Sequence, residues 1–243
     1  MVSKKAQLKF LAGLIIALVG AGVIFSVFFF DSQEKDDKEA ELFCMSSLKL
    51  RANLVLQVGD AKITSAPLLC KTLDKKVTGE EEDIKEQLAY LMARCWKIFG
   101  EGTYEEILEA DNLRNLFNIA QAGNDCFMCY SAQIDESDID ISKNEMFRYL
   151  VENEHRNMNT NYIDYFQDYG GPGNVVINDD IKGDHLYGVV FLSKNSDDKN
   201  LQWLADLASD EDIYGISNRA TSSIIFDNIN NIGKANCLVK DLG

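Results

Sequence analysis

Six cysteines carry most of the chemical potential of this 243-residue chain, and they are unevenly placed. All of them follow residue 43, at positions Cys44, Cys70, Cys95, Cys126, Cys129 and Cys237. An even number of cysteines in an exported domain is typical of disulfide bonds, because such bonds persist in oxidising compartments. Free buried thiols are the alternative, since cysteine is among the most buried residue types. We expect structural disulfides, with a pairing that the sequence leaves open.

Cys126 and Cys129 form a Cys-Phe-Met-Cys motif, for which three kinds of chemistry compete. A redox pair of thioredoxin type needs its first cysteine at the start of a helix, where the helix dipole lowers the pKa of the thiol. A structural zinc site needs a second cysteine pair at similar spacing, and the chain has none. The residues that follow, Tyr130-Ser-Ala-Gln-Ile, favour a strand. The motif therefore indicates structural disulfide bonding, with a membrane-tethered thiol–disulfide oxidoreductase as an alternative.

The acidic run over residues 135–140 has the residue types of a calcium site but not their spacing. A loop of EF-hand type that begins at Asp138 needs Gly at position 143 and Glu at position 149, where this chain has Lys143 and Tyr149. The two histidines lie in polar stretches, and the chain contains no Gly-x-Ser-x-Gly motif. We therefore expect no metal, no cofactor and no catalytic residue, which favours a protein that is not an enzyme.

Four aromatic residues occur at close spacing, namely Tyr162, Tyr165, Phe166 and Tyr169. Aromatic side chains are enriched in protein interfaces, so a contact surface for a protein partner is one interpretation. Packing in the core is the other interpretation and the default one.

Every residue from Phe10 to Phe30 is uncharged, and the lysines at positions 4, 5 and 9 precede this run. At about 1.5 Å per residue, a helix of this length approaches the roughly 30 Å thickness of the hydrocarbon core of a bilayer. A cleaved signal peptide has a shorter apolar core and a small-residue cleavage site, whereas this run ends in three phenylalanines. We expect a transmembrane anchor over residues 10–30, with the lysine-bearing terminus in the cytoplasm and the rest of the chain outside.

The segment Lys5-Ala6-Gln7-Leu8 resembles the cleavage region of archaeal type IV pilin precursors. Processing after Ala6 would leave a mature chain that starts at Gln7 and assembles through its apolar helix. Lys9 would then lie inside the mature hydrophobic segment, and Leu11 stands where pilins often have Glu. A pilin-like filament subunit is therefore kept as an alternative.

The net charge of −15 is an average over two unlike parts. Residues 1–30 have three lysines and no acidic residue, which leaves 21 basic and 39 acidic side chains in the other 213 residues, a net of −18. Phosphate binding depends on clustered Lys and Arg, so this composition argues against a nucleic-acid partner. We interpret the outward acidity as a solvated surface.

Hydrophobic periodicity beyond the anchor predicts one domain of the α+β class. The expected helices cover residues 34–46, 80–99, 103–120 and 199–208, with a further one starting at Ser142, and the expected strands cover 48–63 (a hairpin turning at 59–60), 174–178, 187–193 and 222–226. The helix over 80–99 has the clearest signal, because Thr78 and Glu81 form a capping-box pattern and its apolar residues share one face that includes Cys95.

One run of residues is distinctive enough to suggest a family. It is Cys95-Trp96-x-x-Phe99-Gly100-Glu101-Gly102, which stands between Cys70 and Cys126-x-x-Cys129 in a chain with a lysine-flanked anchor. This combination resembles uncharacterised membrane-anchored proteins of small-genome archaea of the DPANN type. The resemblance covers roughly residues 1–130 and fades beyond them. It implies a location and a cysteine framework, and no activity.

These observations predict four regions: a basic cytoplasmic tail (1–9), a transmembrane helix (10–30), a stalk (31–46) and one disulfide-stabilised α+β ectodomain (47–243). The expected function is a structural or protein-interaction role at the cell surface. The expected partners are the lipid bilayer, through residues 10–30, and a protein.

Overall fold

The computed structural model describes most of the chain after residue 35. The described ranges are 36–52, 55–58, 61–64, 68–103, 126–167, 175–192 and 222–234. The chain divides into two compact units, Met1–Glu41 and Leu42–Gly243. The predicted anchor over residues 10–30, the helices expected over 103–120 and 199–208, Tyr169 and Cys237 lie outside the described residues. Within the described ranges, no helix has the length and apolar character needed to cross a membrane.

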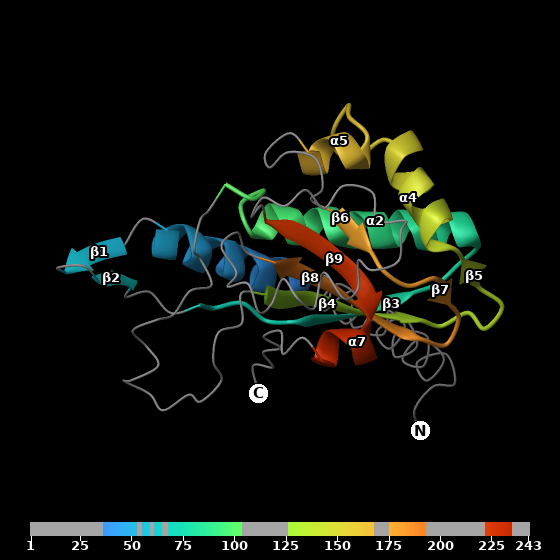
Figure 1. The fold of residues 1–243 in the computed structure, drawn as a ribbon, viewed down its shortest axis with the longest axis horizontal. Helices are drawn as coiled ribbons and strands as arrows, with labels where there is room; N and C mark the ends of the chain where they lie inside the picture. The colour runs from blue at the N-terminus through green and yellow to red at the C-terminus, as the bar shows by residue number, and fades with distance from the viewer. Residues whose placement is uncertain are drawn as a thin grey trace, which may run out of the picture. The chain divides into compact units, whose positions relative to one another are not determined.

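A five-stranded sheet forms the centre of the second unit (Figure 1). Its order is β3 (Leu73–Val77), β4 (Cys126–Ile134), β8 (Leu186–Leu192), β9 (Ser223–Asn228) and β6 (Val175–Ile177). The β3–β4 and β9–β6 pairs are parallel, whereas β8 runs antiparallel to both of its neighbours. The carboxyl ends of four strands therefore meet the start of β8 at one edge of the sheet. The strands expected over 174–178, 187–193 and 222–226 are confirmed, as is the mixed α+β class.

Helix α2 (Glu81–Ile98) covers one face of this sheet and contacts four of its strands (Figure 1). Its apolar residues recur at helical spacing and are buried, including Ile84, Leu88, Met92 and Cys95. The predicted capping box is displaced by two residues, because Glu80 is the N-cap and pairs with Asp83 rather than Thr78 with Glu81. The Glu80 carboxylate accepts hydrogen bonds from the unpaired N–H groups at the start of the helix, as a hydroxyl would. Its negative charge also interacts favourably with the positive end of the helix dipole.

Two shorter helices lie beyond α2, and a third lies on the opposite face of the sheet (Figure 1). Helix α4 (Lys143–Glu152) begins with the predicted capping box, in which Ser142 is the N-cap and Glu145 its partner. Helix α5 (Tyr162–Gln167) contacts both α2 and α4. Helix α7 (Ile229–Lys234) contacts β8 and β9 from the other side, so the sheet is covered on both faces. Strands β5 (Asp140–Ile141) and β7 (Ile181–Lys182) form a separate antiparallel pair.

The helix predicted over residues 34–46 extends to residue 52 in the structure. Residues 48–52 were expected to begin a strand, and that expectation is wrong. In the helix, Cys44, Ser47, Leu48 and Arg51 recur at three- and four-residue spacing and are all buried, so they form one buried stripe. The alternation of apolar and polar residues that suggested a strand is part of this helical pattern. The predicted hairpin follows as β1 (Val55–Val58) and β2 (Ala61–Thr64), with Val58 paired to Ala61.

Candidate functional site

Two disulfides each join a helix to another part of the chain, and both are made of cysteines predicted to form such bonds. Cys95 of α2 is bonded to Cys129 of β4, with their Cα atoms 5.8 Å apart. The register between β4 and β8 slips at this point, because Met128 pairs with Val190 and the next paired residue is Tyr130. Cys129 is thus the extra residue of a β-bulge and has no paired residue on β8. Its side chain lies on the same face of β4 as Phe127, which contacts Phe99 at the end of α2.

Cys126 lies on the opposite face of β4 from Cys129. Residues three apart in a strand point to opposite faces, and Cys126 packs with Met128, Ile225 and Ile232 in the core cluster under α7. Cys126 is itself disulfide-bonded. The two cysteines of the Cys-x-x-Cys motif are therefore committed to different partners, and the motif begins a strand rather than a helix. This geometry agrees with the structural interpretation of the motif.

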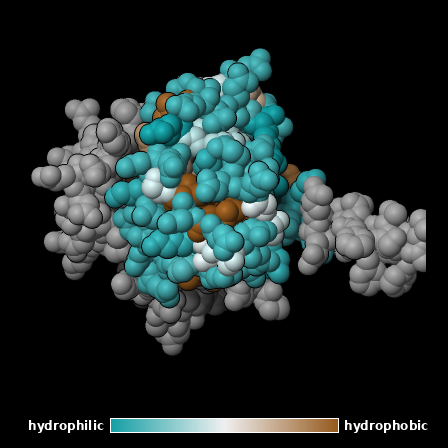
Figure 2. Space-filling view, turned by 90° about the vertical axis from the view of Figure 1, so that its right-hand side faces the viewer, coloured by the Kyte–Doolittle hydropathy of each residue, from teal (hydrophilic) through white to brown (hydrophobic). Residues whose placement is uncertain are grey.

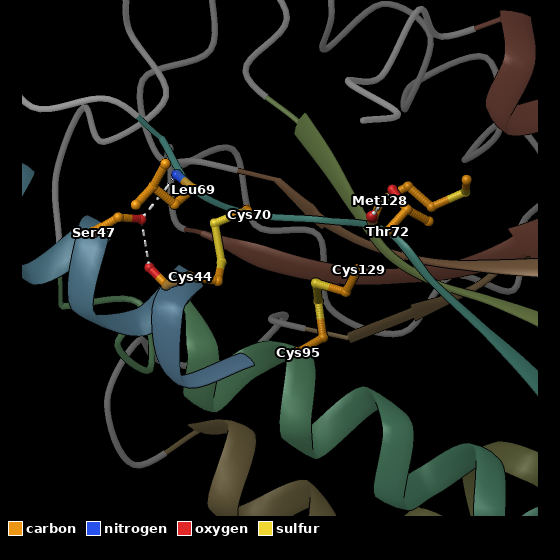
Figure 3. The surroundings of a disulfide bond; sticks show 8 residues. All are labelled: Cys44, Ser47, Leu69, Cys70, Thr72, Cys95, Met128 and Cys129. Carbon is orange, nitrogen blue, oxygen red and sulfur yellow. Dashed lines mark hydrogen bonds between the residues drawn. A yellow bond between two sulfur atoms is a disulfide. The ribbon is translucent and has the colours of Figure 1, made fainter. Parts of the chain in front are cut away.

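The second disulfide joins Cys44 to Cys70 and connects the helix over residues 36–52 to the segment before β3 (Figure 3). Ser47 completes the junction, because its hydroxyl donates to the carbonyl of Cys44 at 2.8 Å and accepts from the N–H of Leu69 at 3.1 Å. Further along the same segment, the Thr72 hydroxyl donates to the carbonyl of Met128 at 2.8 Å, next to the bulge. The segment from Cys70 to Thr72 thus connects the two disulfides, and the side chains of both of these end residues are buried.

The distinctive run after Cys95 ends α2 in a tight left-handed turn. Gly100, Glu101 and Gly102 all have positive φ, at 71°, 57° and 71°. The N–H of Glu101 donates to the carbonyl of Trp96 at 2.9 Å, and the N–H of Gly100 donates to that of Lys97 at 3.1 Å, which satisfies the last carbonyls of the helix. A Cβ on Gly102 would lie 2.6 Å from the Trp96 ring, so only glycine fits against the indole.

The aromatic members of this run lie in the core between α2 and the sheet. The Phe99 ring stacks on Phe191 of β8 with centroids 4.3 Å apart, and it also contacts Phe127. Trp96 meets Phe191 and Phe166. The run therefore has a structural explanation at each of its defined positions.

The described members of the predicted aromatic surface are buried. Tyr162, Tyr165 and Phe166 all lie on α5 with almost no exposure, so core packing and not an exposed contact surface accounts for them. The Tyr165 hydroxyl donates to the Glu101 carboxylate at 2.8 Å, which connects α5 to the turn after α2. His155 packs against Tyr162 and Tyr165, and its burial lowers the pKa of its imidazole.

A buried carboxylate that the sequence patterns missed lies at the edge of the sheet where the parallel strands end. Asp227 of β9 is completely buried. Its carboxylate accepts from the Nδ2 atoms of Asn178 at 3.0 Å and Asn231 at 3.1 Å, and from the N–H of Asn228 at 2.6 Å. The same Asn231 amide donates to Asp179 at 2.9 Å. The topology brings these groups together, because Asn178 directly follows β6 and β6 pairs in parallel with β9.

Burial raises the pKa of Asp227 to about 6, and the nearby Asp179 charge adds to this increase. The donated amide hydrogen bonds act in the opposite direction, because they stabilise the charged form. Asp227 is therefore poised to gain or lose a proton close to neutral pH. The side of the molecule that lies on the right in Figure 1 faces the viewer in Figure 2, and its surface is mainly hydrophilic with a small apolar patch near the centre. The described part of the chain has no group of acidic, histidine and cysteine side chains arranged to hold a metal.

No protein-family model, curated protein or solved structure matches this chain. The resemblance to small-genome archaeal proteins therefore stays a prediction.

Proposed function

We propose that this chain is a single-pass membrane protein whose α+β domain lies outside the cytoplasm and has a structural or protein-interaction role at the cell surface. The observation that carries the proposal is the pair of disulfides, Cys44–Cys70 and Cys95–Cys129. Buried disulfides between separate elements are typical of proteins that fold in an oxidising compartment, and thiols of cytosolic proteins are kept reduced. The uncharged run over residues 10–30 supplies the means of attachment.

The placement of the disulfides supports a stabilising function for them. Each one joins segments that are distant in sequence, with separations of 26 and 34 residues. All four of these cysteines are buried, which shields them from exchange with thiols in solution. A domain held in this way keeps its surface geometry in an oxidising compartment, where its disulfides persist.

The proposal is tested by expressing the full chain in a bacterial host and following its location and its thiols together. The wild-type chain is expected to resist alkaline extraction from membranes, to be digested by protease added outside spheroplasts, and to have blocked cysteines until a reductant is added. A variant that lacks residues 10–30 is the matched control, and it is expected to remain soluble in the cytosol with reactive thiols.

Each outcome has a separate meaning. Extraction of the wild-type chain by alkali would contradict the anchor, and reactive thiols in the membrane-bound chain would contradict the outward orientation. Recovery of a mature chain that starts at Gln7 and forms filaments would instead support the pilin-like alternative.

A further inference from the structure

Exposed apolar side chains gather beside the Cys44–Cys70 disulfide. Leu42 is 61% exposed, Phe43 62%, Leu50 51% and Leu69 45%. They make up four of the six large hydrophobic residues that the described part of the chain exposes. Scattered apolar residues are ordinary on protein surfaces, but a gathering of this kind marks an interaction site. We call these four residues the outer apolar face.

The helix over residues 36–52 has one side buried against the domain and an exposed side with large apolar residues. At about 100° per residue, the buried stripe that includes Cys44, Leu48 and Arg51 lies opposite an exposed arc that contains Leu42, Phe43 and Leu50. Leu69 adjoins this arc because its N–H is bonded to Ser47 on the same helix. The stripe already packs on the domain, so the outer apolar face is directed away from it and has no partner among the described residues.

A bilayer surface fits this face better than a second protein copy does. Stable protein interfaces use about 20–30 residues on each side, and the outer apolar face offers four. An amphipathic helix needs no such area, because it binds by inserting one apolar face roughly 5–10 Å into the boundary between headgroups and acyl chains. Glu39 and Lys49 are both exposed on the same arc of the helix, so the arc has no net charge from this pair. The Lys49 ammonium group can extend to lipid phosphates.

The segment between the predicted anchor and the helix is short enough to keep the outer apolar face within reach of the bilayer. Residues 31–35 separate the predicted anchor from the helix, and at about 3.5 Å per residue they span at most roughly 17 Å. Phe43 lies about 10 Å further along the helix, at about 1.5 Å per residue. The chain is therefore short enough for the outer apolar face to reach the membrane surface. A helix parallel to the bilayer would place Leu42, Phe43 and Leu50 at similar depth.

We propose that the outer apolar face docks on the phospholipid surface next to the anchor, so that the domain lies on the membrane instead of extending away from it. This inference rests on the anchored topology proposed above. The disulfide at Cys44–Cys70 then has a second consequence, because it holds the membrane-facing helix and Leu69 in one rigid surface.

The test uses the full chain, reconstituted into phosphatidylcholine vesicles with or without bromine atoms on the acyl chains near the headgroup. Tryptophan is introduced by Phe43→Trp, and Leu50→Trp is a second variant in case the first does not fold. Met158→Trp is the matched control, because Met158 is also an exposed apolar residue, 37% exposed, but lies between α4 and α5. The emission of the wild-type chain is subtracted to remove its own tryptophans.

The brominated lipid is expected to quench the emission added by Phe43→Trp and by Leu50→Trp, and to leave that of Met158→Trp unchanged. Equal emission in both kinds of vesicle for the two helix variants would overturn the inference. Energy transfer between labelled copies that depends on Phe43, in place of quenching, would also overturn it and assign the face to a second copy. Alkaline extraction of the same vesicles separates the two proposals: removal of the chain contradicts the anchor, whereas a retained but unquenched chain contradicts only the docking.

Discussion

Asp227→Asn is expected to change how the stability of the domain depends on pH. Burial raises the pKa of this carboxyl from 3.8 to about 6 in the folded chain. Between these two values the folded chain holds a proton that the unfolded chain releases, so protonation stabilises the fold. This contribution is fully present below about pH 4, declines as the pH rises and is lost above about pH 6. Asparagine has no such titration.

The expected size follows from the pKa difference. Each pKa unit corresponds to about 1.4 kcal/mol, so ionisation of Asp227 lowers the free energy of unfolding of the wild-type chain by about 3 kcal/mol between pH 4 and pH 7. The variant is therefore expected to gain about 3 kcal/mol relative to the wild type over this range. Its absolute stability also depends on the hydrogen bonds that change, since an Asn amide cannot accept from all three donors that surround Asp227.

The assay is urea unfolding of the full chain in detergent, with disulfides intact, followed by tryptophan fluorescence at several pH values from 4 to 7. Only the difference between variant and wild type is interpreted, because the exposed acidic residues titrate alike in both. Asp179→Asn is a control that removes the neighbouring charge. It is expected to lower the pKa of Asp227, so that the loss of stability with rising pH is complete at a lower pH than in the wild type. A variant-minus-wild-type difference that stays constant, or that falls as the pH rises, would refute the argument.

Two further predictions concern the packing around the disulfide framework. Gly102→Ala is expected to destabilise the domain more than Gly100→Ala in urea unfolding. Both glycines have positive φ, so an alanine at either position costs about 1–2 kcal/mol. Only at Gly102 would the added Cβ also lie 2.6 Å from the Trp96 ring. Equal losses for the two variants would contradict this contact. The double variant Cys95→Ala with Cys129→Ala is expected to lose about 3–4 kcal/mol of stability, given a closed loop of 34 residues; a loss below 1 kcal/mol would show that the bond does not constrain the chain.

The elements with strong local signals were predictable from the sequence. Helix α2 has acidic residues in its first turn, an apolar face and glycines at its end, and these features act within a few residues of each other. The buried strands β8 and β9 were recognisable as short apolar runs. The exception is the helix that extends to residue 52. An alternating pattern over a few residues is consistent with a strand or with a helix, and in this chain the burial of Leu48 and Arg51 favours the helix.

The features that depend on chain topology were not predictable. Which cysteines pair depends on the placement of α2 on β4, which brings Cys95 to Cys129 and is not visible in a spacing pattern. The environment of Asp227 is created by the parallel pairing of β6 with β9, which brings Asn178 beside it from 49 residues away. A partial signal existed, because polar residues at the ends of parallel strands gather at one edge of a sheet, but the strand order was needed to use it.

Disulfide mapping of the chain from native membranes tests the central claim most directly. Free thiols are blocked at the moment of lysis, and the unreduced protein is digested and analysed by mass spectrometry. We expect peptides that join Cys44 to Cys70 and Cys95 to Cys129. Because Cys126 is also bonded and Cys237 is the one cysteine left, a third peptide joining these two is expected. Recovery of the same cysteines in alkylated form, or a bond between Cys126 and Cys129, would contradict the claim of a disulfide-stabilised domain outside the cytoplasm.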